Sequence, residues 1–249
     1  MRWRRGMAAG PTDGAAAPER KTRPLRIRNA ATLIILDRSG DEPKVLMGRR
    51  HAGHKFMPGL FVFPGGRIEL GDRAMPVAGT LNDRAEAALA EKVHPPLFHL
   101  GRVLALAAIR ETYEETGLMV GSLDYGPPET APPGAWSAFR EAGVMPDLEM
   151  LQFVARAITP PSRPKRFDTR FFAVDREAVV AETPGIVGPD SELTELAWVD
   201  LAAARKLDLP RITGIVLDEL EARLAAGFGP MLPVPFFRDV DGEHTREEL

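Results

Sequence analysis

The sequence predicts an α/β (α+β) fold in which helices cover both faces of a mixed β-sheet, an α/β/α sandwich. Two observations lead to this prediction. Short apolar runs rich in β-branched residues alternate along the chain with longer helical patterns. A predicted hairpin comes early in the chain, and an amphipathic helix comes near its end. Hydrophobic residues make up 44% of the 249 residues, which is enough for a sizeable core.

We expect one domain, at residues 25–227, between two terminal tails. Residues 1–24 are basic and then rich in Ala, Gly and Pro, a composition typical of disorder. Residues 228–249 show no clear periodic pattern, so we expect a loosely attached C-terminal tail.

The first part of the domain is predicted to be β-structure. The apolar run Ala30–Leu36 within residues 25–37 predicts a buried strand. Ser39-Gly40-Asp41 then turns the chain into a partner strand at 44–50. A loop over residues 51–60 follows, and a third strand at 61–63 leads into Gly65-Gly66. The loop holds His51 and His54, which we interpret as surface or substrate-edge residues, not as metal ligands.

The middle of the chain is predicted to be helical. Residues 81–92 are rich in alanine, and Asn82 or Asp83 can cap the N-terminus of a helix there. Pro95-Pro96 ends that helix, and a second one is predicted over residues 97–116. Gly117 follows it, as expected for a left-handed C-cap.

The remaining elements complete the predicted sandwich. A Gly- and Pro-rich connector at 121–133 leads to a short helix at 134–141. Strands are predicted at 151–158 and 167–174, and another one carries Trp198. Helices are predicted at 201–206 and 211–226.

Charge and composition exclude several classes of partner. The net charge of −3 gives no general attraction to nucleic acid or to an anionic membrane. The chain has no cysteine, which excludes disulfides and thiolate chemistry. No apolar run reaches the roughly 18 residues that a membrane span needs. The first 24 residues lack the continuous apolar run of a secretory signal, so we expect a cytoplasmic protein.

Three glutamates on one helix form the strongest candidate site. At about 100° per residue, Glu111, Glu114 and Glu115 share one face of the predicted helix. Arg110 can offset Glu114 but cannot neutralise all three acids. Such a cluster is either a solvated helix face or a ligand set for Mg²⁺, which prefers carboxylate oxygens.

Together with the glycine turn, this helix resembles the Nudix box, whose pattern is G-x5-E-x7-R-E-U-x-E-E-x-G-U, where U is apolar. Gly66 matches the first glycine, and the segment from Arg110 to Leu118 matches the second half, except that Thr112 occupies an apolar position. Asp72 stands where the pattern has glutamate. A further departure is the spacer, because 37 residues separate Asp72 from Arg110 instead of seven. We therefore predict an insertion, which makes the spacer 30 residues longer than in the pattern and lies at about residues 73–98.

The resemblance covers roughly residues 25–227 and implies a Nudix-type sandwich and a diphosphatase. It implies that Mg²⁺ or Mn²⁺ is held by Glu111, Glu114, Glu115 and the carbonyl of Gly66. Water would attack phosphorus in a nucleoside diphosphate linked to another group. Members of the family differ in their general base, so Glu111, Glu192 and Glu195 all stay open. Homodimers are common in the family.

Supporting and substrate-binding roles follow from the same resemblance. Arg110 would orient Glu114, and Asp72 would support the loop without binding metal. Guanidinium and ammonium groups suit phosphate. The candidates for binding it are Arg49, Arg50, Arg163, Lys165, Arg166 and Arg170.

Two loop motifs narrow the resemblance further. The stretches M-P-G-x-x-V-F-P-G-G and T-P-P-x-x-P-x-R-F-D-T-R-F-F resemble those of CoA and acyl-CoA diphosphatases. The alternatives are a Nudix hydrolase for substrates of the ADP-ribose or NADH type, a Nudix-fold module that binds a nucleotide without cutting it, and an interaction protein without a catalytic site. The intact glutamates argue against the last two.

Overall fold

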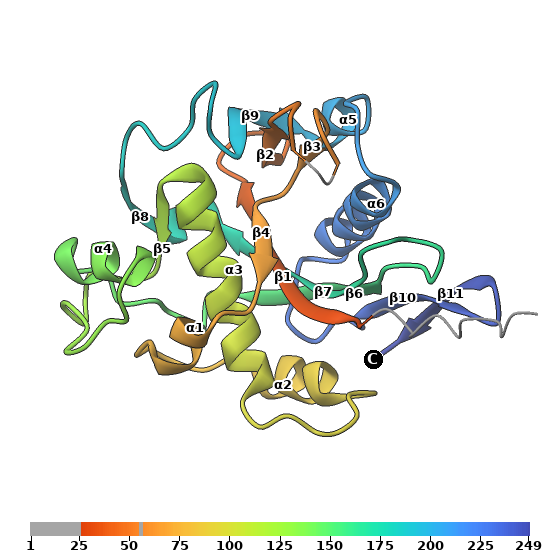
Figure 1. Cartoon of the computed structure of the whole chain (residues 1–249), viewed down its shortest axis with the longest axis horizontal. Helices are drawn as coiled ribbons and strands as arrows, with labels where there is room; N and C mark the ends of the chain where they lie inside the picture. Colours follow the sequence, from red (N-terminus) through yellow and green to blue (C-terminus); the bar gives the residue numbers. More distant parts are fainter. Residues whose placement is uncertain (1–25, 55–56) are drawn as a thin grey trace, which may run out of the picture.

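The computed structural model describes residues 26–54 and 57–249, so the predicted N-terminal tail lies outside the described residues. A mixed sheet forms the centre of the molecule (Figure 1). Its strands are β1 (Arg28–Asp37), β2 (Lys44–Arg50), β3 (Phe61–Val62), β4 (Gly65–Arg67), β6 (Gln152–Ile158), β7 (Phe167–Asp175), β9 (Leu193–Asp200), β10 (Pro235–Val240) and β11 (Glu243–Glu248).

The strand order is β11-β10-β6-β7-β1-β2-β3, and β4 and β9 pair with β1 and β2 respectively. The β1–β7 and β10–β6 pairs are parallel, and the other pairs are antiparallel. A second, two-stranded sheet pairs β5 (Leu118–Val120) with β8 (Val179–Glu182), which follows a 3-10 turn at Arg176–Ala178. The predicted α/β fold with a mixed sheet is confirmed.

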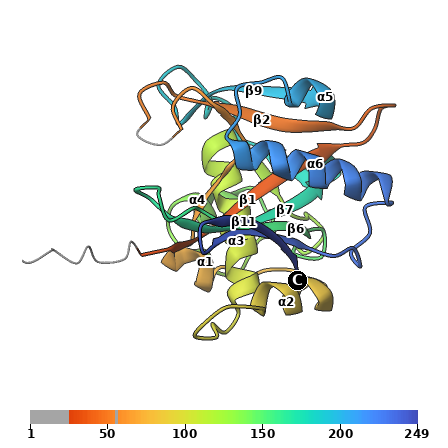
Figure 2. The ribbon, with the colours of Figure 1, turned by 90° about the vertical axis from the view of Figure 1, so that its right-hand side faces the viewer.

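Helices lie on both faces of the main sheet (Figures 1 and 2). The helices are α1 (Leu70–Ala74), α2 (Asp83–Ala90), α3 (Leu100–Thr116), α4 (Ala135–Glu141), α5 (Leu201–Ala204) and α6 (Arg211–Ala225). None of the helices within the described ranges is long and apolar enough to cross a membrane.

The side chains of β1 alternate between two cores. Leu33 and Ile35 pack on the α3 face, whereas Ile34 and Leu36 pack on the α6 face, and all four are fully buried. A strand covered on both faces needs such a continuous apolar run. β1 is thus fixed firmly between the two layers, and it carries β4 and its glycines at one end.

Helix α3 begins three residues later than predicted and ends at Thr116 as predicted. Its C-cap Gly117 has φ 82°, a left-handed conformation that glycine adopts without steric cost. In α2, Asn82 is the N-cap, because its side chain accepts from the backbone N–H of Ala85 at 2.9 Å. The short elements α1, β5 and β8 were not predicted, because segments of three to five residues carry little periodic signal.

The C-terminal segment differs from the predicted loose tail. Residues 235–248 form the hairpin β10–β11, which adds two strands to the main sheet. Phe236 of β10 is 1% exposed and pairs with Arg156 of β6, so its burial anchors the hairpin. The expectation of a loosely attached tail from residue 228 onward was wrong. The charged sequence of β11 gives no strand pattern, so the apolar contacts of β10 could not be anticipated.

Candidate active site

A pair of glycines lies where helix α3 approaches the sheet. Gly65 and Gly66 lie in β4 and pair with Thr32 and Ala31 of β1. A Cβ atom on Gly66 would lie 2.3 Å from the carboxyl carbon of Glu111, and one on Gly65 would lie 2.5 Å from the carbonyl oxygen of Ala31. A larger residue at position 66 would displace the Glu111 side chain, and one at position 65 would clash with the backbone of β1. Gly66 therefore leaves the space that the Glu111 carboxylate occupies, and Gly65 lets β4 pair closely with β1.

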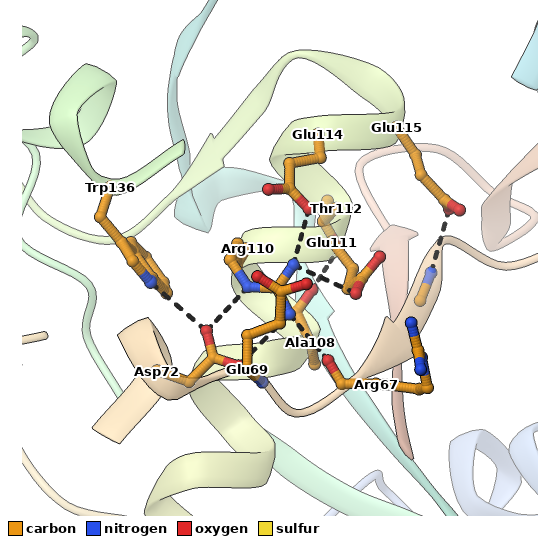
Figure 3. Close-up of polar contacts among 11 residues, drawn as sticks. Arg67, Glu69, Asp72, Ala108, Arg110, Glu111, Thr112, Glu114, Glu115 and Trp136 are labelled. Carbon is orange, nitrogen blue, oxygen red and sulfur yellow. Dashed lines mark hydrogen bonds and ion pairs between the residues drawn. The ribbon is translucent and has the colours of Figure 1, made fainter. Parts of the chain in front are cut away.

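Two of the three glutamates point at this glycine corner (Figure 3). The backbone N–H of Gly65 donates to Oε2 of Glu115 at 3.1 Å, and Glu115 is 4% exposed. Its other oxygen, Oε1, is buried and has no hydrogen-bond partner among the described residues. The Glu111 side chain is 16% exposed. A buried carboxylate oxygen without a partner is costly, so this position calls for a cationic ligand.

Burial is the main influence on the protonation of these acids. It raises the pKa of Glu111 to about 7, although the Arg110 charge acts in the opposite direction. Burial also raises the pKa of Glu115 well above its usual range, with a further contribution from the negative charge of Glu192. The pKa of Glu114 is raised by burial as well. In the absence of a cation, burial therefore favours the neutral form of these acids.

Arg110 connects the acids to the loop that follows β4. Its Nε and Nη2 donate to the two carboxylate oxygens of Asp72 at 2.8 and 3.2 Å, and Nη2 also donates to the carbonyl of Arg67 at 2.8 Å. Its Nη1 donates to Glu114 at 2.6 Å and lies 3.1 Å from Oε1 of Glu111. Arg110 is 3% exposed, and therefore orients carboxylates instead of facing solvent.

Asp72 is the fixed point of this network. It is fully buried and accepts from the backbone N–H of Glu69 at 2.7 Å and from the indole N–H of Trp136 at 3.3 Å, in addition to Arg110 (Figure 3). The contact with Trp136 of α4 was not anticipated. A tryptophan in the predicted short helix at 134–141 was the one signal available, and the sequence does not reveal its partner.

A second ion pair approaches the acids from β2 and the start of β9. Nη2 of Arg50 donates to Oε1 of Glu192, and Nε2 of His54 lies 3.4 Å from the same oxygen. The charges of Arg50 and Glu192 both act on the pKa of Glu115, in opposite directions. The structure therefore brings Arg50 and Glu192, far apart in sequence, to the glutamates of α3.

Glu195 and Arg49 lie elsewhere on the same strands. Glu195 is within β9, opposite Arg49, and their charged atoms are 3.9 Å apart. Both side chains are about half exposed, and the Arg49 guanidinium lies over the ring of Phe61. No contact or electrostatic influence between Glu195 and the glutamates of α3 is recorded within the described residues.

The predicted basic patch is only partly on the surface. Arg163 and Lys165 are exposed on the β6–β7 loop, and Arg166 is half-buried with its Nε donating to the carbonyl of Thr159 at 2.9 Å. Arg170, in contrast, is fully buried, and its pKa is lowered to about 10 by burial. The prediction that Arg170 belongs to this patch was wrong, because alternation along β7 turns its side chain into the core.

The donor set at the corner fits a divalent cation of the Mg²⁺ type. Within the described residues there is no group of three or more acidic or histidine side chains close enough to enclose a metal on their own. Mg²⁺ does not require one, because it commonly takes one or two carboxylates and completes its shell with water and phosphate oxygens. The partnerless Oε1 of Glu115 and the close approach of Glu111 to Gly66 are the two features that fit such an ion.

The fold and this corner define an α/β protein with a buried acidic site between helix α3 and a glycine turn. No family model matches the sequence. A crystal structure of a Nudix hydrolase from Alicyclobacillus acidocaldarius is similar, with 30% sequence identity and a TM-score of 0.59, over 80% of this chain and 92% of that chain.

A relative from Caenorhabditis elegans, described as nudix hydrolase 7, is 26% identical over 201 residues. The match covers 74% of this chain and 57% of the relative, so the chain corresponds to little more than half of that protein's length. At this identity and coverage of the Alicyclobacillus structure, the chain belongs to the Nudix hydrolase family.

Proposed function

We propose that this protein is a diphosphatase that hydrolyses, with Mg²⁺ or Mn²⁺, a nucleoside diphosphate linked to another group. One observation carries the proposal: Glu115 and Glu111 are buried at the Gly65-Gly66 corner, and an oxygen of Glu115 has no partner. A protein that used this corner only for packing would gain stability by replacing these acids with apolar residues.

The proposed ligands of the ion are Glu111, Glu114, Glu115 and the carbonyl oxygen of Gly66. When bound, the ion would lower the pKa of a bound water and neutralise charge on the diphosphate. Arg110 holds Glu114 and Glu111 in place through hydrogen bonds and an ion pair.

The general base removes the proton from the attacking water as its oxygen bonds to phosphorus. The anhydride P–O bond breaks, and the leaving phosphate carries away the bonding electron pair. Glu111 and Glu192 are the candidates, since both approach the corner. Glu195 is the less favoured one, because it pairs with Arg49 on the strand.

The substrate class is a further part of the proposal. Arg50 lies beside Glu115, and the exposed Arg163 and Lys165 on the β6–β7 loop offer charges for a second phosphate group. A CoA or acyl-CoA carries such a phosphate on its ribose, which agrees with the loop motifs. Substrates of the ADP-ribose or NADH type, which lack it, are the alternative.

A substrate panel tests the proposal. The protein is incubated with CoA, an acyl-CoA, ADP-ribose, NADH, dinucleoside polyphosphates or nucleoside triphosphates, with Mg²⁺, with Mn²⁺ or with a chelator. We expect metal-dependent release of 3′,5′-ADP from a CoA substrate. Release of a nucleoside monophosphate from ADP-ribose or NADH instead would support the alternative substrate class.

Two controls make the result specific. In ¹⁸O-labelled water the label should enter a phosphate of the product, because water attacks phosphorus. Glu115→Gln should lose most of its activity, whereas Glu129→Gln, an exposed glutamate of the connector, should keep full activity. Binding of a nucleotide without turnover of any substrate would favour the silent binding module.

A further inference from the structure

We infer that Trp136 is a positioning residue for the metal-binding glutamates and that it acts through Asp72 and Arg110. This inference rests on the proposed function and deepens it, because it assigns a role at the same site to a residue outside the box. Trp136 lies in α4, which no motif connects with the glutamates.

The argument begins with the carboxylate of Asp72. It is fully buried and accepts four hydrogen bonds: two from Arg110, one from the backbone N–H of Glu69 and one from the Trp136 indole. A buried carboxylate keeps one orientation only while its lone pairs are satisfied. Three of these bonds come from residues of the glycine loop and α3, and the fourth comes from α4.

The indole is held so that its N–H faces Asp72. Trp136 is 1% exposed, and its ring meets the ring of Phe139 edge-on with centroids 5.1 Å apart. Phe139 in turn meets Tyr113 of α3 at 5.5 Å. On the other side, a Cβ on Gly71 of α1 would lie 3.4 Å from Cδ1 of Trp136. The ring therefore sits in fixed packing against α1 and is linked through Phe139 to α3.

The chain's departure from the box pattern gives this contact a reason. The pattern has glutamate where Asp72 stands, and aspartate is shorter by one methylene group. Trp136 reaches Oδ1 of the shorter side chain, the oxygen that also accepts from Nε of Arg110. Its N–H thus supports the carboxylate that anchors Arg110, and Arg110 contacts Glu111 and Glu114.

Loss of the indole N–H should weaken the series of contacts that runs from Trp136 through Asp72 and Arg110 to the glutamates. Without it, Asp72 has one donor fewer, and Arg110 gains freedom to draw Glu111 and Glu114 away from the corner. Removal of a residue that orients metal ligands commonly costs 10–100-fold in metal affinity or activity. For Trp136→Phe, which keeps an aromatic ring, we expect about a 10-fold higher Mn²⁺ dissociation constant and a lower kcat with KM changed less.

A double-mutant cycle on the complete protein tests whether Trp136 acts through Asp72. Mn²⁺ affinity is measured by titration calorimetry for the wild type, Trp136→Phe, Asp72→Asn and the double variant. If Trp136 acts through Asp72, its substitution weakens binding in the wild-type background and changes little in the Asp72→Asn background. Equal losses in both backgrounds would overturn the inference.

A matched control separates positioning from packing. Phe153→Leu removes a buried aromatic ring of the same core from β6, where it packs on Phe172, and leaves the Trp136 N–H and its ring contacts in place. We expect it to lower the melting temperature and to leave the Mn²⁺ affinity unchanged. If it weakens Mn²⁺ binding as much as Trp136→Phe does, the effect comes from packing and the inference fails.

A third readout needs neither metal nor substrate. The indole ¹H–¹⁵N signal of Trp136, identified by its disappearance in Trp136→Phe, should shift in Asp72→Asn. Should the wild type bind Mn²⁺ and hydrolyse substrate while Trp136→Phe behaves identically, the inference fails and the proposed function stands. A wild type that neither binds Mn²⁺ nor cuts any substrate would overturn both, even if the indole signal shifts.

Discussion

Two buried ionic clusters lie on the α3 side of the sheet, and they differ in their excess charge. At the glycine corner, Arg110 faces the acids Asp72, Glu111 and Glu114. In the β6–β7 cluster, by contrast, Arg156 and Arg170 share the single acid Asp168, with contacts of 2.8 and 3.0 Å.

The second cluster is enclosed in the core, where Arg156 and Arg170 are 2% and 0% exposed. Arg156 also donates to the carbonyl of Glu91 at 2.8 Å and lies over the ring of Phe236, 4.4 Å from its centroid. Arg170 donates to Asn29 at 2.7 Å and to the carbonyl of Asp168. Nε and Nη2 of Arg170 nevertheless have no hydrogen-bond partner among the described residues. The acid cluster likewise leaves a carboxylate oxygen of Glu115 without a partner, but its Glu111 and Glu114 side chains are 16% and 41% exposed, so a ligand can reach them. A buried ionic cluster is therefore a candidate site when part of it reaches solvent.

The largest expected effect is on stability and concerns the β6–β7 cluster. Asp168→Asn removes the only acid that Arg156 and Arg170 contact among the described residues, and it leaves two buried cations unpaired. Breaking a buried pair costs about 3–5 kcal/mol. We expect a loss of this size in denaturant unfolding, with metal affinity of the folded fraction unchanged. A variant as stable as the wild type would show that this cluster is not structural.

The next largest effect is on activity and concerns the acid cluster. Glu115→Gln should lower kcat about 100–1,000-fold, which is typical of losing one preorganised electrostatic group. The same change replaces a buried acid, whose pKa burial raises, by a neutral amide of the same shape, so the melting temperature of the metal-free protein should stay equal or rise. Hydrolysis assays and thermal unfolding check both expectations. Full activity would contradict the metal assignment, and unfolding would make the corner structural like the β6–β7 cluster.

The pH dependence of stability should come from the acid cluster. The pKa of Glu111 is about 7 in the folded protein and near 4.5 in the unfolded chain. Between these values the folded state binds more protons, so the stability of the metal-free protein should fall as pH rises from about 4.5 to 7.

Metal should compensate for this loss. Mn²⁺ at 100 times its dissociation constant adds about 2.7 kcal/mol. We expect a larger rise in melting temperature at pH 8 than at pH 5, where protonated acids bind metal poorly. Glu111→Gln should make the metal-free pH profile less steep, while Glu114 and Glu115, whose pKa values burial also raises, keep part of the slope. The same slope in that variant would assign the dependence to another group.

The smallest effect concerns Arg163, which lies on the exposed β6–β7 loop. Arg163→Ala changes an exposed residue, so unfolding free energy should stay within about 0.5 kcal/mol of the wild type. If Arg163 binds a phosphate of the substrate, KM should rise with kcat unchanged. Steady-state kinetics on the preferred substrate measure this. An unchanged KM would remove Arg163 from the substrate site.

Much of the fold could be predicted from the sequence because its long elements have strong patterns. The run Ala30–Leu36 gave β1, and the pattern over 97–116 with Gly117 gave α3. Register and pairing partners could not be predicted, since they depend on contacts between distant segments. The hairpin β10–β11 was missed for that reason: Phe236 is recognisable as a core residue only once β6 lies beside it.

The candidate site shows the same limit. The spacing of Glu111, Glu114 and Glu115 predicts a shared helix face, but it does not show that Glu114 turns to Arg110 while Glu115 turns to Gly65. The charge of Arg170 suggested phosphate binding, yet strand alternation places it in the core. Trp136 carried no charge pattern at all, so only the three-dimensional contact with Asp72 assigns it a role.

The C-terminal hairpin also protects the molecule from self-association. β10 covers the edge of β6, whose backbone would otherwise offer free donors and acceptors to any extended chain. The outermost strand, β11, has the sequence Glu-His-Thr-Arg-Glu-Glu, and a charged edge of this kind discourages pairing with strands of other molecules. Residues 235–248 therefore work against edge-to-edge aggregation. A version of the chain that stops before Pro235 would expose the unpaired backbone edge of β6.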